Sequence, residues 1–438
     1  MIPKNHKRFT GQVPRFVALF SAALLVPGVL LPAVAAGGAT NEIDVELVDI
    51  GSKPKNVSVA SGTDVVLKVK NTGAILHNLQ VNGGKKGTGD MKAGAAKSIK
   101  LGKVTKTVKL WCTIVGHKEA GMTFDVKVGR DRATEEDTST RVGAAGDLKL
   151  DPSATWPKGF KSDDPNLKPA DAATTHDVTF HMTNKIIEVA PGVKQEMWTF
   201  GDQVPGPTLH GKVGDTFNVT IVNDTKMTHN IDFHASQTSM DVDMGPVEPG
   251  ESLTYTFKAE YSGIWMYHCG TAPALHHIGN GMAGAVVIDP PNLAPVDHEW
   301  TMVQSDLYFG AKNKPGSLSK MQAFQPDAIV FNGKARQYAD SPLKVKVGDR
   351  IRIWVLDVGP SENSAFHVVG TIFDTAFKEG AYVLRKGNAE QGGMQALDLQ
   401  PAQGGFVEFE VRKAGMYAMV THKFQNVGKG ALGVIVAE

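Results

Sequence analysis

Cysteine is scarce in this chain, which has two cysteines in 438 residues. So few cysteines exclude a fold held together by several disulfides, because at most one disulfide can form. Charge of one sign is not in excess either, since 46 Lys and Arg residues accompany 45 Asp and Glu residues. A nucleic-acid partner is therefore not indicated. No segment after residue 35 is long and apolar enough to span a bilayer.

The first 35 residues have the pattern of an export signal. Basic residues precede an apolar stretch over 16–34, which ends in Ala33-Val34-Ala35. That order is typical of a cleaved secretory signal peptide. We therefore expect residues 1–35 to be a signal peptide and the protein to be exported, to the periplasm or another extracytoplasmic space. A retained membrane anchor is the alternative, which Pro27 and Pro32 disfavour because they interrupt the stretch.

The rest of the chain repeats itself loosely three times. Each repeat runs from a Gly/Asp turn through a β-rich segment to a histidine, and then to a strand that begins at a glycine. The three histidines are His77, His229 and His367. Alternation of apolar and polar residues, as in the Leu-Lys-Val-Lys-Val of 343–347, predicts half-buried strands.

These repeats predict an all-β protein of three cupredoxin-like Greek-key β-sandwiches. We place the sandwiches at residues 40–130, 175–291 and 292–438. Residues 131–174 are rich in charge, Pro, Ser and Thr, a composition that suits a linker along the surface.

Each cysteine is followed by a histidine and a methionine, and the gap between these two is the same in both places. The two sets, each with the upstream histidine of its repeat, are His77, Cys112, His117, Met122 and His229, Cys269, His277, Met282. Two imidazoles, a thiolate and a weak axial thioether form the blue (type 1) copper site of cupredoxins. Zinc suits the methionine less well, and a disulfide would leave both His/Met pairs unexplained. His276 competes with its neighbour as the ligand, but the matched gap favours His277.

The second repeat carries the ligands of a further metal site. His234 follows His229 by five residues, and His268 directly precedes Cys269. Successive side chains of a strand point to opposite faces, so His268 faces away from the cysteine and meets His234 at a different ion. Two ligands are too few for a tight site, so a third comes from elsewhere.

The third repeat lacks a cysteine, and Thr421 and Ala431 occupy the positions expected for the cysteine and the methionine. This repeat therefore holds no type 1 copper. It keeps His367 and His422 at ligand-like positions. Either histidine alone is as easily explained as a core residue, but the pair falls at both ligand-bearing points of the repeat.

Over about 175–438 the chain resembles the copper-containing nitrite reductases. The motifs that carry the resemblance are Pro205-Gly206-Pro207, 229–234, His268-Cys269, 277–282, 364–370 and Thr421-His422. The additional N-terminal repeat is similar to that of the three-domain members. His276 departs from the family pattern, in which a tryptophan is common at this position.

The resemblance implies the one-electron reduction of nitrite to nitric oxide and water by a homotrimer with two type 1 coppers and one type 2 copper per chain. Electrons from a small cupredoxin or a c-type cytochrome would reach the type 2 copper through the His268-Cys269 link. His234, His268 and, from the neighbouring subunit, His422 would hold that copper. Asp232 and His367 would flank nitrite as the catalytic acid–base residues, with Val369 as the apolar position over the ligand.

Two other functions remain as alternatives. A laccase-like multicopper oxidase would need a three-copper cluster built from His-x-His pairs, and the sequence contains no His-x-His. A multi-copper electron carrier is the second alternative. It would not account for four further histidines, which are His234, His268, His367 and His422.

Overall fold

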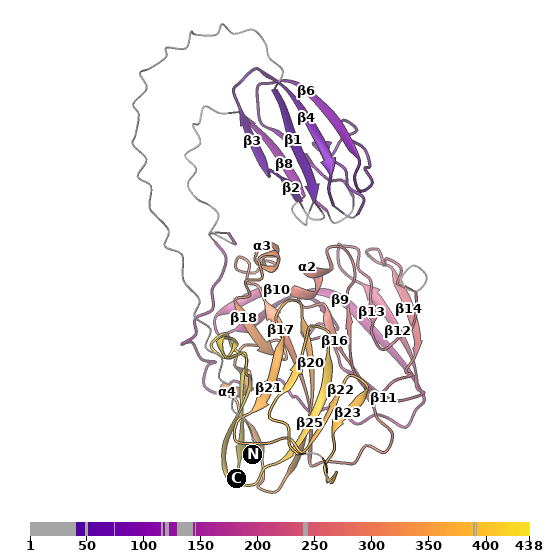
Figure 1. Ribbon diagram of the computed structural model, residues 1–438, viewed down its shortest axis with the longest axis vertical. Helices are drawn as coiled ribbons and strands as arrows, with labels where there is room; N and C mark the ends of the chain where they lie inside the picture. The colour runs from indigo at the N-terminus through magenta and orange to yellow at the C-terminus, as the bar shows by residue number, and fades with distance from the viewer. Residues whose placement is uncertain are drawn as a thin grey trace, which may run out of the picture.

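The computed structural model describes residues 41–48, 51–73, 75–114, 117–118, 122–128, 143–144, 146–239, 244–388, 390 and 392–438. The predicted signal peptide (1–35) and the first part of the predicted linker (131–142) lie outside these residues. The described chain consists of β-strands with a few short helices (Figure 1). None of the described helices is long and apolar enough to cross a membrane.

The first unit, residues 41–128, has two four-stranded sheets with the orders β2-β1-β4-β6 and β3-β8-β7-β5. Valine and isoleucine alternate with lysine and other polar residues along these strands, so each sheet turns one face inward. The strands are β1 (Asn41–Val48), β2 (Gly51–Lys53), β3 (Asn56–Val59), β4 (Thr63–Asn71), β5 (Gln80–Val81), β6 (Ala96–Val104), β7 (Val108–Trp111) and β8 (Thr123–Val128).

The second unit, residues 175–289, also has two four-stranded sheets, with the orders β10-β9-β12-β14 and β11-β16-β15-β13. The strands are β9 (Thr175–Ala190), β10 (Val193–Phe200), β11 (Leu209–Lys212), β12 (Thr216–Asn223), β13 (Asp232–Phe233), β14 (Ser252–Lys258), β15 (Gly263–His268) and β16 (Ala283–Asp289). The short helix α2 (Ala274–Gly279) lies between β15 and β16.

The third unit, residues 298–437, pairs a six-stranded sheet, β18-β17-β20-β25-β22-β23, with a five-stranded sheet, β19-β27-β26-β21-β24. Its strands are β17 (His298–Leu307), β18 (Ala328–Phe331), β19 (Leu343–Val345), β20 (Arg350–Gly359), β21 (Ser364–Val368), β22 (Thr375–Lys378), β23 (Ala381–Leu384), β24 (Leu397–Leu399), β25 (Gly404–Glu410), β26 (Gly415–Thr421) and β27 (Leu432–Ala437). Its short helices are α3 (Leu318–Gln322), α4 (Gln337–Asp340) and the 3₁₀ turn η2 (Phe424–Asn426).

The three units share one pattern of strand pairing. In one sheet of each unit, the first strand runs parallel to a later one, as β1 with β4, β9 with β12 and β17 with β20. In the other sheet, an edge strand runs parallel to the last strand, as β3 with β8, β11 with β16 and β19 with β27. The prediction of an all-β protein built from cupredoxin-like sandwiches is confirmed.

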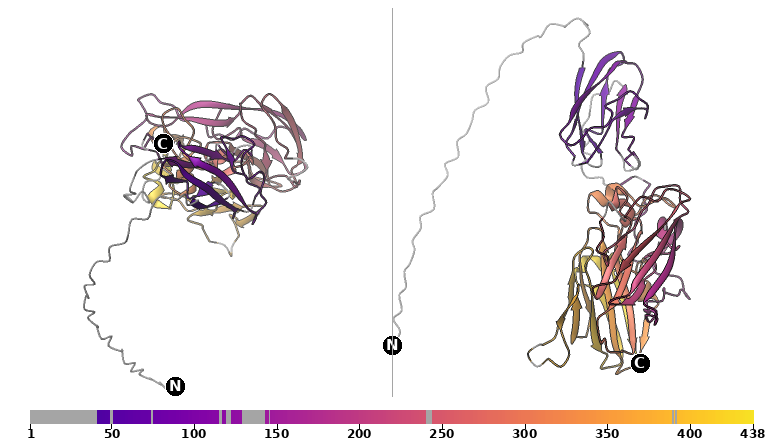
Figure 2. Two further views of the ribbon diagram at one scale, coloured as in Figure 1. Left: turned by 90° about the horizontal axis from the view of Figure 1, so that it is seen from above. Right: turned by 90° about the vertical axis from the view of Figure 1, so that its right-hand side faces the viewer.

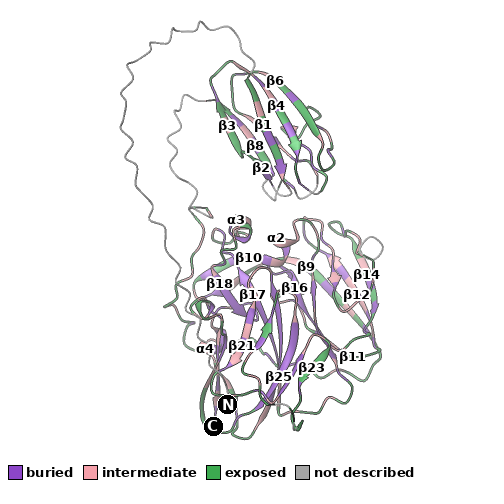
Figure 3. Cartoon of the chain, in the orientation of Figure 1, coloured by how far each residue is buried: buried purple, intermediate pink, exposed green. Residues whose placement is uncertain are grey.

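Each unit has an apolar core between its two sheets, and the buried residues are purple in Figure 3. Two further clusters join the second unit to the third. In one of them Met266 and Val287 pack with Trp354 and Phe406, and in the other Met197 packs with the strands of the third unit. These two units therefore share buried surface, and among the described residues no such cluster includes the first unit.

The first unit lies beyond the end of the other two at which α2 and α3 are found (Figures 1 and 2). The described part of the linker packs on the second and third units. Trp156 Nε1 donates to the carbonyl of Ala335, and Asn166 forms an isolated bridge with Trp300. The linker therefore follows the surface of these two units. Helix α2 lies at the end of the second unit that is nearest to the first unit (Figure 1).

Candidate metal centres

The first unit gathers His77, Cys112 and His117, and Cys112 lines a pocket together with His276 and His277 of the second unit. The Nδ1 atoms of the two histidines lie 3.2 Å apart, and Cys112 Sγ lies 3.4 Å from His117 Nδ1. All three residues are buried. Cys112 N–H donates to the carbonyl of Met122, which is also buried, so the methionine lies beside the group.

The second unit repeats this arrangement with His229, Cys269 and His277. The two Nδ1 atoms again lie 3.2 Å apart, and Cys269 Sγ lies 3.2 Å from His277 Nδ1 and 3.7 Å from His229 Nδ1. Met282 is buried, and its carbonyl accepts from Cys269 N–H. The structure brings His277 to this group, whereas His276 Nε2 donates to the carbonyl of Gly316.

Both groups fit a copper ion. Burial lowers the pKa of His229 to about 4, and burial, with His229 and His276 nearby, lowers that of His277 to about 3. Two neutral imidazoles whose Nδ1 atoms lie 3.2 Å apart can turn both Nδ1 lone pairs toward a single cation. Burial also raises the pKa of the Cys269 thiol, so a metal ion has to stabilise the thiolate.

A third group lies on the other side of the His268-Cys269 peptide. The Nε2 atoms of His234 and His268 lie 3.1 Å apart, and Asp232 Oδ2 lies 3.6 Å from His268 Nε2 and 3.9 Å from His234 Nε2. Strand pairing explains the contact, because Asp232 lies opposite His268 in the β13–β15 register. Burial, and then the neighbouring His268, lower the pKa of His234, so its imidazole is neutral and able to bind a metal.

The second and third groups are joined through adjacent residues. His268 ends β15 and Cys269 follows it, with their side chains in different groups. In addition, His268 Nδ1 lies 3.1 Å from the carbonyl oxygen of Cys269, to which it donates. One peptide bond and one hydrogen bond therefore connect the two sites.

The third unit carries His367 and His422 near each other, with ring centroids 5.6 Å apart. His422 is exposed, and among the described residues it is not in the group of Asp232, His234 and His268. Val369, beside this pair, is 45% exposed. Thr421 is buried, and its hydroxyl accepts from Ala365 N–H at 3.0 Å, so this unit has a hydrogen bond where the others have a thiol.

Comparison with known proteins identifies the family. The multicopper oxidase family profile matches residues 181–293. The copper-containing nitrite reductase of Neisseria gonorrhoeae is 35% identical over 272 residues, which are 60% of this chain and 68% of the relative. The chain belongs to the copper-containing nitrite reductases. The resemblance predicted for residues 175–438 is thereby confirmed at the level of the family.

Solved structures of this family agree with the fold. A copper nitrite reductase from Nitrosomonas europaea matches with a TM-score of 0.56 and 29% identity, over 60% of this chain and 94% of that one. A copper-containing nitrite reductase from Thermus scotoductus matches with a TM-score of 0.55 and 31% identity, over 60% of this chain and 62% of that one.

Sequence reasoning missed two asparagines that hold the loops following Cys112 and Cys269. Asn230 Oδ1 accepts from Gly270 N–H at 2.6 Å, and Asn78 Oδ1 accepts from Thr113 N–H at 2.8 Å. Each bond fixes the residue that follows the cysteine of one of these groups. The signal was present in the sequence, because both asparagines directly follow the upstream histidine of their repeat.

Trp198 was missed as well. Its ring packs against His276 and His277 with centroids 4.7 and 4.9 Å away, and against His229 at 6.3 Å. An indole therefore lies beside this group even though His276 stands where the family commonly has a tryptophan. Trp198 comes from β10, about 80 residues before α2, so no local motif connects it to the site.

Proposed function

We propose that this chain reduces nitrite to nitric oxide at a type 2 copper, with electrons supplied by a type 1 copper through the His268-Cys269 link. The observation that carries the proposal is the division of this dipeptide between two metal groups. The reaction consumes one electron and two protons for each nitrite and releases one nitric oxide and one water. Copper supplies single-electron exchange at the thiolate sites and an open position for the anion at the imidazole site.

The chain's own residues supply the path for the electron. Cys269 belongs to the buried group with His229 and His277, and His268 belongs to the group with His234. Because the two are covalent neighbours, the separation between the sites is fixed by backbone geometry. Burial of the thiolate group keeps water away and so limits the rearrangement that accompanies each electron transfer.

Asp232 and His367 are the proton carriers in this proposal. Asp232 lies beside both imidazoles of its group and is partly exposed, so it can exchange protons with solvent. A carboxylate and an imidazole next to a reacting oxygen can deliver the two protons that water formation needs. Since His367 lies in the third unit with His422, it reaches nitrite together with that ligand.

We propose a homotrimer in which His422 of each chain completes the imidazole site of its neighbour. Two histidines and one carboxylate from a single chain leave the site short of a ligand. Around His367 and His422 the apolar side chains Val369, Ile372 and Phe424 are 45%, 69% and 60% exposed. Apolar side chains gathered around a ligand histidine suit a surface that a second copy covers.

The proposal also includes export to an extracytoplasmic space and a soluble one-electron donor, either a small cupredoxin or a c-type cytochrome. It assigns two type 1 coppers and one type 2 copper to each chain, and the three groups of candidate ligands support this number.

Anaerobic turnover with nitrite and a reduced dye tests the function. We expect nitric oxide as the product and three coppers per chain. Two coppers per chain without nitric oxide would indicate an electron carrier, and oxygen consumption with five coppers would indicate an oxidase.

A further inference from the structure

The first unit carries an excess of positive charge that the rest of the chain does not share. Residues 41–128 contain 14 lysines and no arginine against 8 Asp and Glu residues, whereas residues 129–438 contain 28 Lys and Arg residues against 37 Asp and Glu residues. From Met91 to Lys118 there are seven lysines and no acidic residue. The near-balance of charge in the whole chain therefore results from a basic unit joined to acidic ones.

Six of the 14 lysines lie along one side of the first unit, which we call the basic edge. β6 is the edge strand of its sheet, and the turn after β5 lies beside it, since Lys86 Nζ donates to the carbonyl of Leu101 at 3.5 Å. All six are exposed, and among the described residues none of them forms an ion pair with a carboxylate, unlike Lys68 with Glu42. The six are Lys85, Lys86, Lys97, Lys100, Lys103 and Lys106.

A bulge in β6 turns two of these lysines to the same face of the sheet. Val66 pairs with Lys100 and Val65 pairs with Gly102, so one extra residue lies between the two positions on β6. In a regular strand, residues three positions apart point to opposite faces. Because of the bulge, Lys103 lies on the outer face together with Lys100, and their charges add on one surface.

The basic edge extends to the end of the unit that is opposite its metal group. β4 leads toward His77, and its first residue, Thr63, pairs with Val104 of the antiparallel β6. Lys106 lies in the turn after β6 and therefore at that opposite end. β1 begins at the same end, because Asn41 pairs with the early part of β4. The predicted signal peptide therefore joins the first unit at its basic end.

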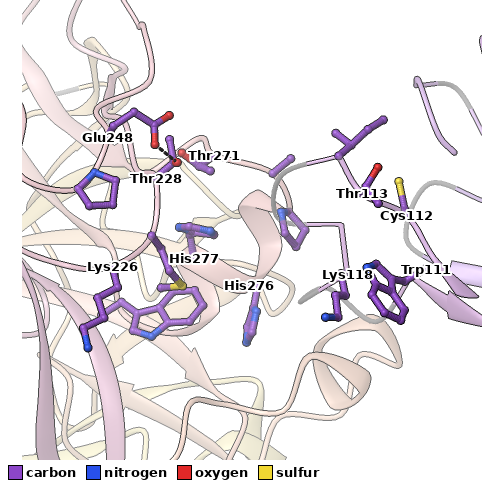
Figure 4. Close-up of a pocket in the computed structure, with 16 residues that line it drawn as sticks. Trp111, Cys112, Thr113, Lys118, Lys226, Thr228, Glu248, Thr271, His276 and His277 are labelled. Carbon is purple, nitrogen blue, oxygen red and sulfur yellow. Dashed lines mark hydrogen bonds between the residues drawn. The ribbon is translucent and has the colours of Figure 1, made fainter. Parts of the chain in front are cut away.

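The basic edge is separate from the pocket between the first and second units. The lysine of the first unit that lines this pocket is Lys118, which is labelled near Trp111 and Cys112 in Figure 4. None of the six lysines of the basic edge lines it. A molecule bound at the basic edge would therefore contact residues that this pocket does not use.

Protection of the edge strand explains only part of the basic edge. Lysines on an edge strand prevent it from pairing with another sheet. Lys85, Lys86 and Lys106, however, lie in turns, where no ladder is left open. The run of residues without an acidic side chain also continues beyond β6. A binding role accounts for the lysines in the turns as well as for those in the strand.

The composition of the basic edge suits a lipid surface better than an acidic protein. Protein interfaces are depleted in lysine and enriched in arginine and aromatic residues. The basic edge offers lysines alone, and the large exposed apolar side chains of this unit, Ile75 and Leu76, directly precede His77 of the metal group. Flexible lysines without apolar neighbours are typical of diffuse attraction to anionic headgroups.

We propose that the basic edge binds a membrane surface that contains anionic lipid and holds the exported chain there by charge. Each lysine near an anionic leaflet strengthens binding by about fivefold, and clusters of about four to eight basic residues are typical of such binding. The acidic second and third units are repelled by the same surface, so they extend into the solvent. The inference uses the proposed export but not the copper chemistry.

Flotation of the copper-loaded protein with lipid vesicles tests the inference. The chain from Ala36 onward is used, so that the apolar stretch of the predicted signal peptide cannot insert into the lipid. Vesicles of phosphatidylglycerol and phosphatidylcholine in equal parts are compared with phosphatidylcholine alone. We expect binding to the anionic vesicles only, and its loss at about 1 M salt, where the Debye length falls to about 3 Å. Binding to both kinds of vesicle, or to neither, would overturn the inference.

A triple variant, Lys100→Gln, Lys103→Gln and Lys106→Gln, tests the location. It removes three charges and keeps polar side chains of similar length, so binding to the anionic vesicles should weaken by about 100-fold. The triple glutamate variant at the same positions should bind more weakly still. Unchanged thiolate–copper absorption shows that each variant is folded, and if the glutamate variant fails to fold, the glutamine variant decides alone.

A control variant separates the basic edge from the net charge of the chain. It carries three exposed lysines of the third unit as glutamines and should bind much as wild type does. These are Lys312→Gln, Lys346→Gln and Lys413→Gln. Equal loss of binding in the control would show that net charge, and not the basic edge, is responsible, and would overturn the inference.

Retention on immobilised polyglutamate distinguishes the other class of partner. Retention without binding to the anionic vesicles would assign the basic edge to an acidic protein and overturn the lipid partner. Nitrite reduction with the dye, measured without vesicles, should be the same in every variant. A failure of the proposed function would therefore appear in that assay, and a failure of this inference in the flotation.

Discussion

The Nε2 atoms of His234 and His268 lie 3.1 Å apart, although 34 residues separate them in the chain. The β13–β15 pairing that brings them together also places Asp232 beside them. A group of side chains that could hold a metal ion, and the carboxylate beside its two imidazoles, thus arise from one short antiparallel ladder.

Replacing Asp232 with asparagine should preserve copper and abolish most turnover. The amide keeps the size of the side chain but carries no exchangeable carboxyl proton, so we expect nitrite reduction to fall by about 10²-fold. Nitric oxide production with a dye donor and copper per chain are the measurements. Asp224→Asn is the control, because Asp224 is an exposed carboxylate paired with His181. Wild-type turnover in a fully loaded Asp232→Asn protein would remove Asp232 from the mechanism.

Mixing two inactive variants should restore activity if His422 acts across a subunit boundary. His234→Ala and His422→Ala each destroy every site in a pure trimer. In a random mixed trimer, roughly one quarter of the sites combine an intact His234 with an intact His422 from the neighbour. We therefore expect about a quarter of wild-type turnover from co-expressed chains. Activity no higher than in either pure variant would show that His422 does not act between subunits.

Asn230→Ala should loosen the loop that carries Cys269. The variant loses the acceptor for Gly270 N–H, an exposed hydrogen bond whose loss costs about 1 kcal/mol or less. We expect weaker copper retention at the Cys269 site during dialysis against a chelator, and an altered thiolate–copper spectrum. Asn218→Ala, which removes exposed hydrogen bonds in the same unit, should leave both unchanged.

Asp306→Asn should stabilise the protein at neutral pH. Burial raises the pKa of the Asp306 carboxyl to about 6 from its ordinary 3.8, so the folded state binds this proton more tightly than the unfolded chain. Its contribution to the free energy of unfolding is complete below about pH 4 and is lost as the pH rises through about 6. The neutral amide avoids this loss, which amounts to up to about 3 kcal/mol.

Thermal unfolding of Asp306→Asn between pH 4 and pH 8 measures this effect. The melting temperature of the variant should exceed that of wild type at pH 8, and the two should converge at pH 4. Glu410→Gln, at an exposed carboxylate of the same unit, is the control and should follow wild type throughout. A variant that is less stable than wild type at pH 8 would contradict the expected ionisation of Asp306.

The sequence predicted those parts of the fold and of the site that leave a local pattern. Strand alternation and the repeated Cys, His and Met spacing are set by neighbouring residues, so the sandwiches and the ligand candidates were visible. Asp306 was not, because in β17 it resembles a polar surface position. Its burial depends on Ser361 and Glu362, whose N–H groups donate to Oδ2 from 55 and 56 residues away. Trp198 was missed because its contacts with His276 and His277 likewise join residues that are far apart in the sequence.

In the third unit, the end of β26 carries Thr421 at the position where the other two units carry a cysteine. The Thr421 hydroxyl accepts from Ala365 N–H, and Ala365 in turn accepts from His422 N–H at 2.7 Å. These two bonds clamp the end of β26 to β21 and leave the imidazole of His422 outside. The position that carries a buried thiol in the two sister units therefore carries a hydroxyl that ties two strands together here, and the next side chain along the chain, His422, is turned to the surface.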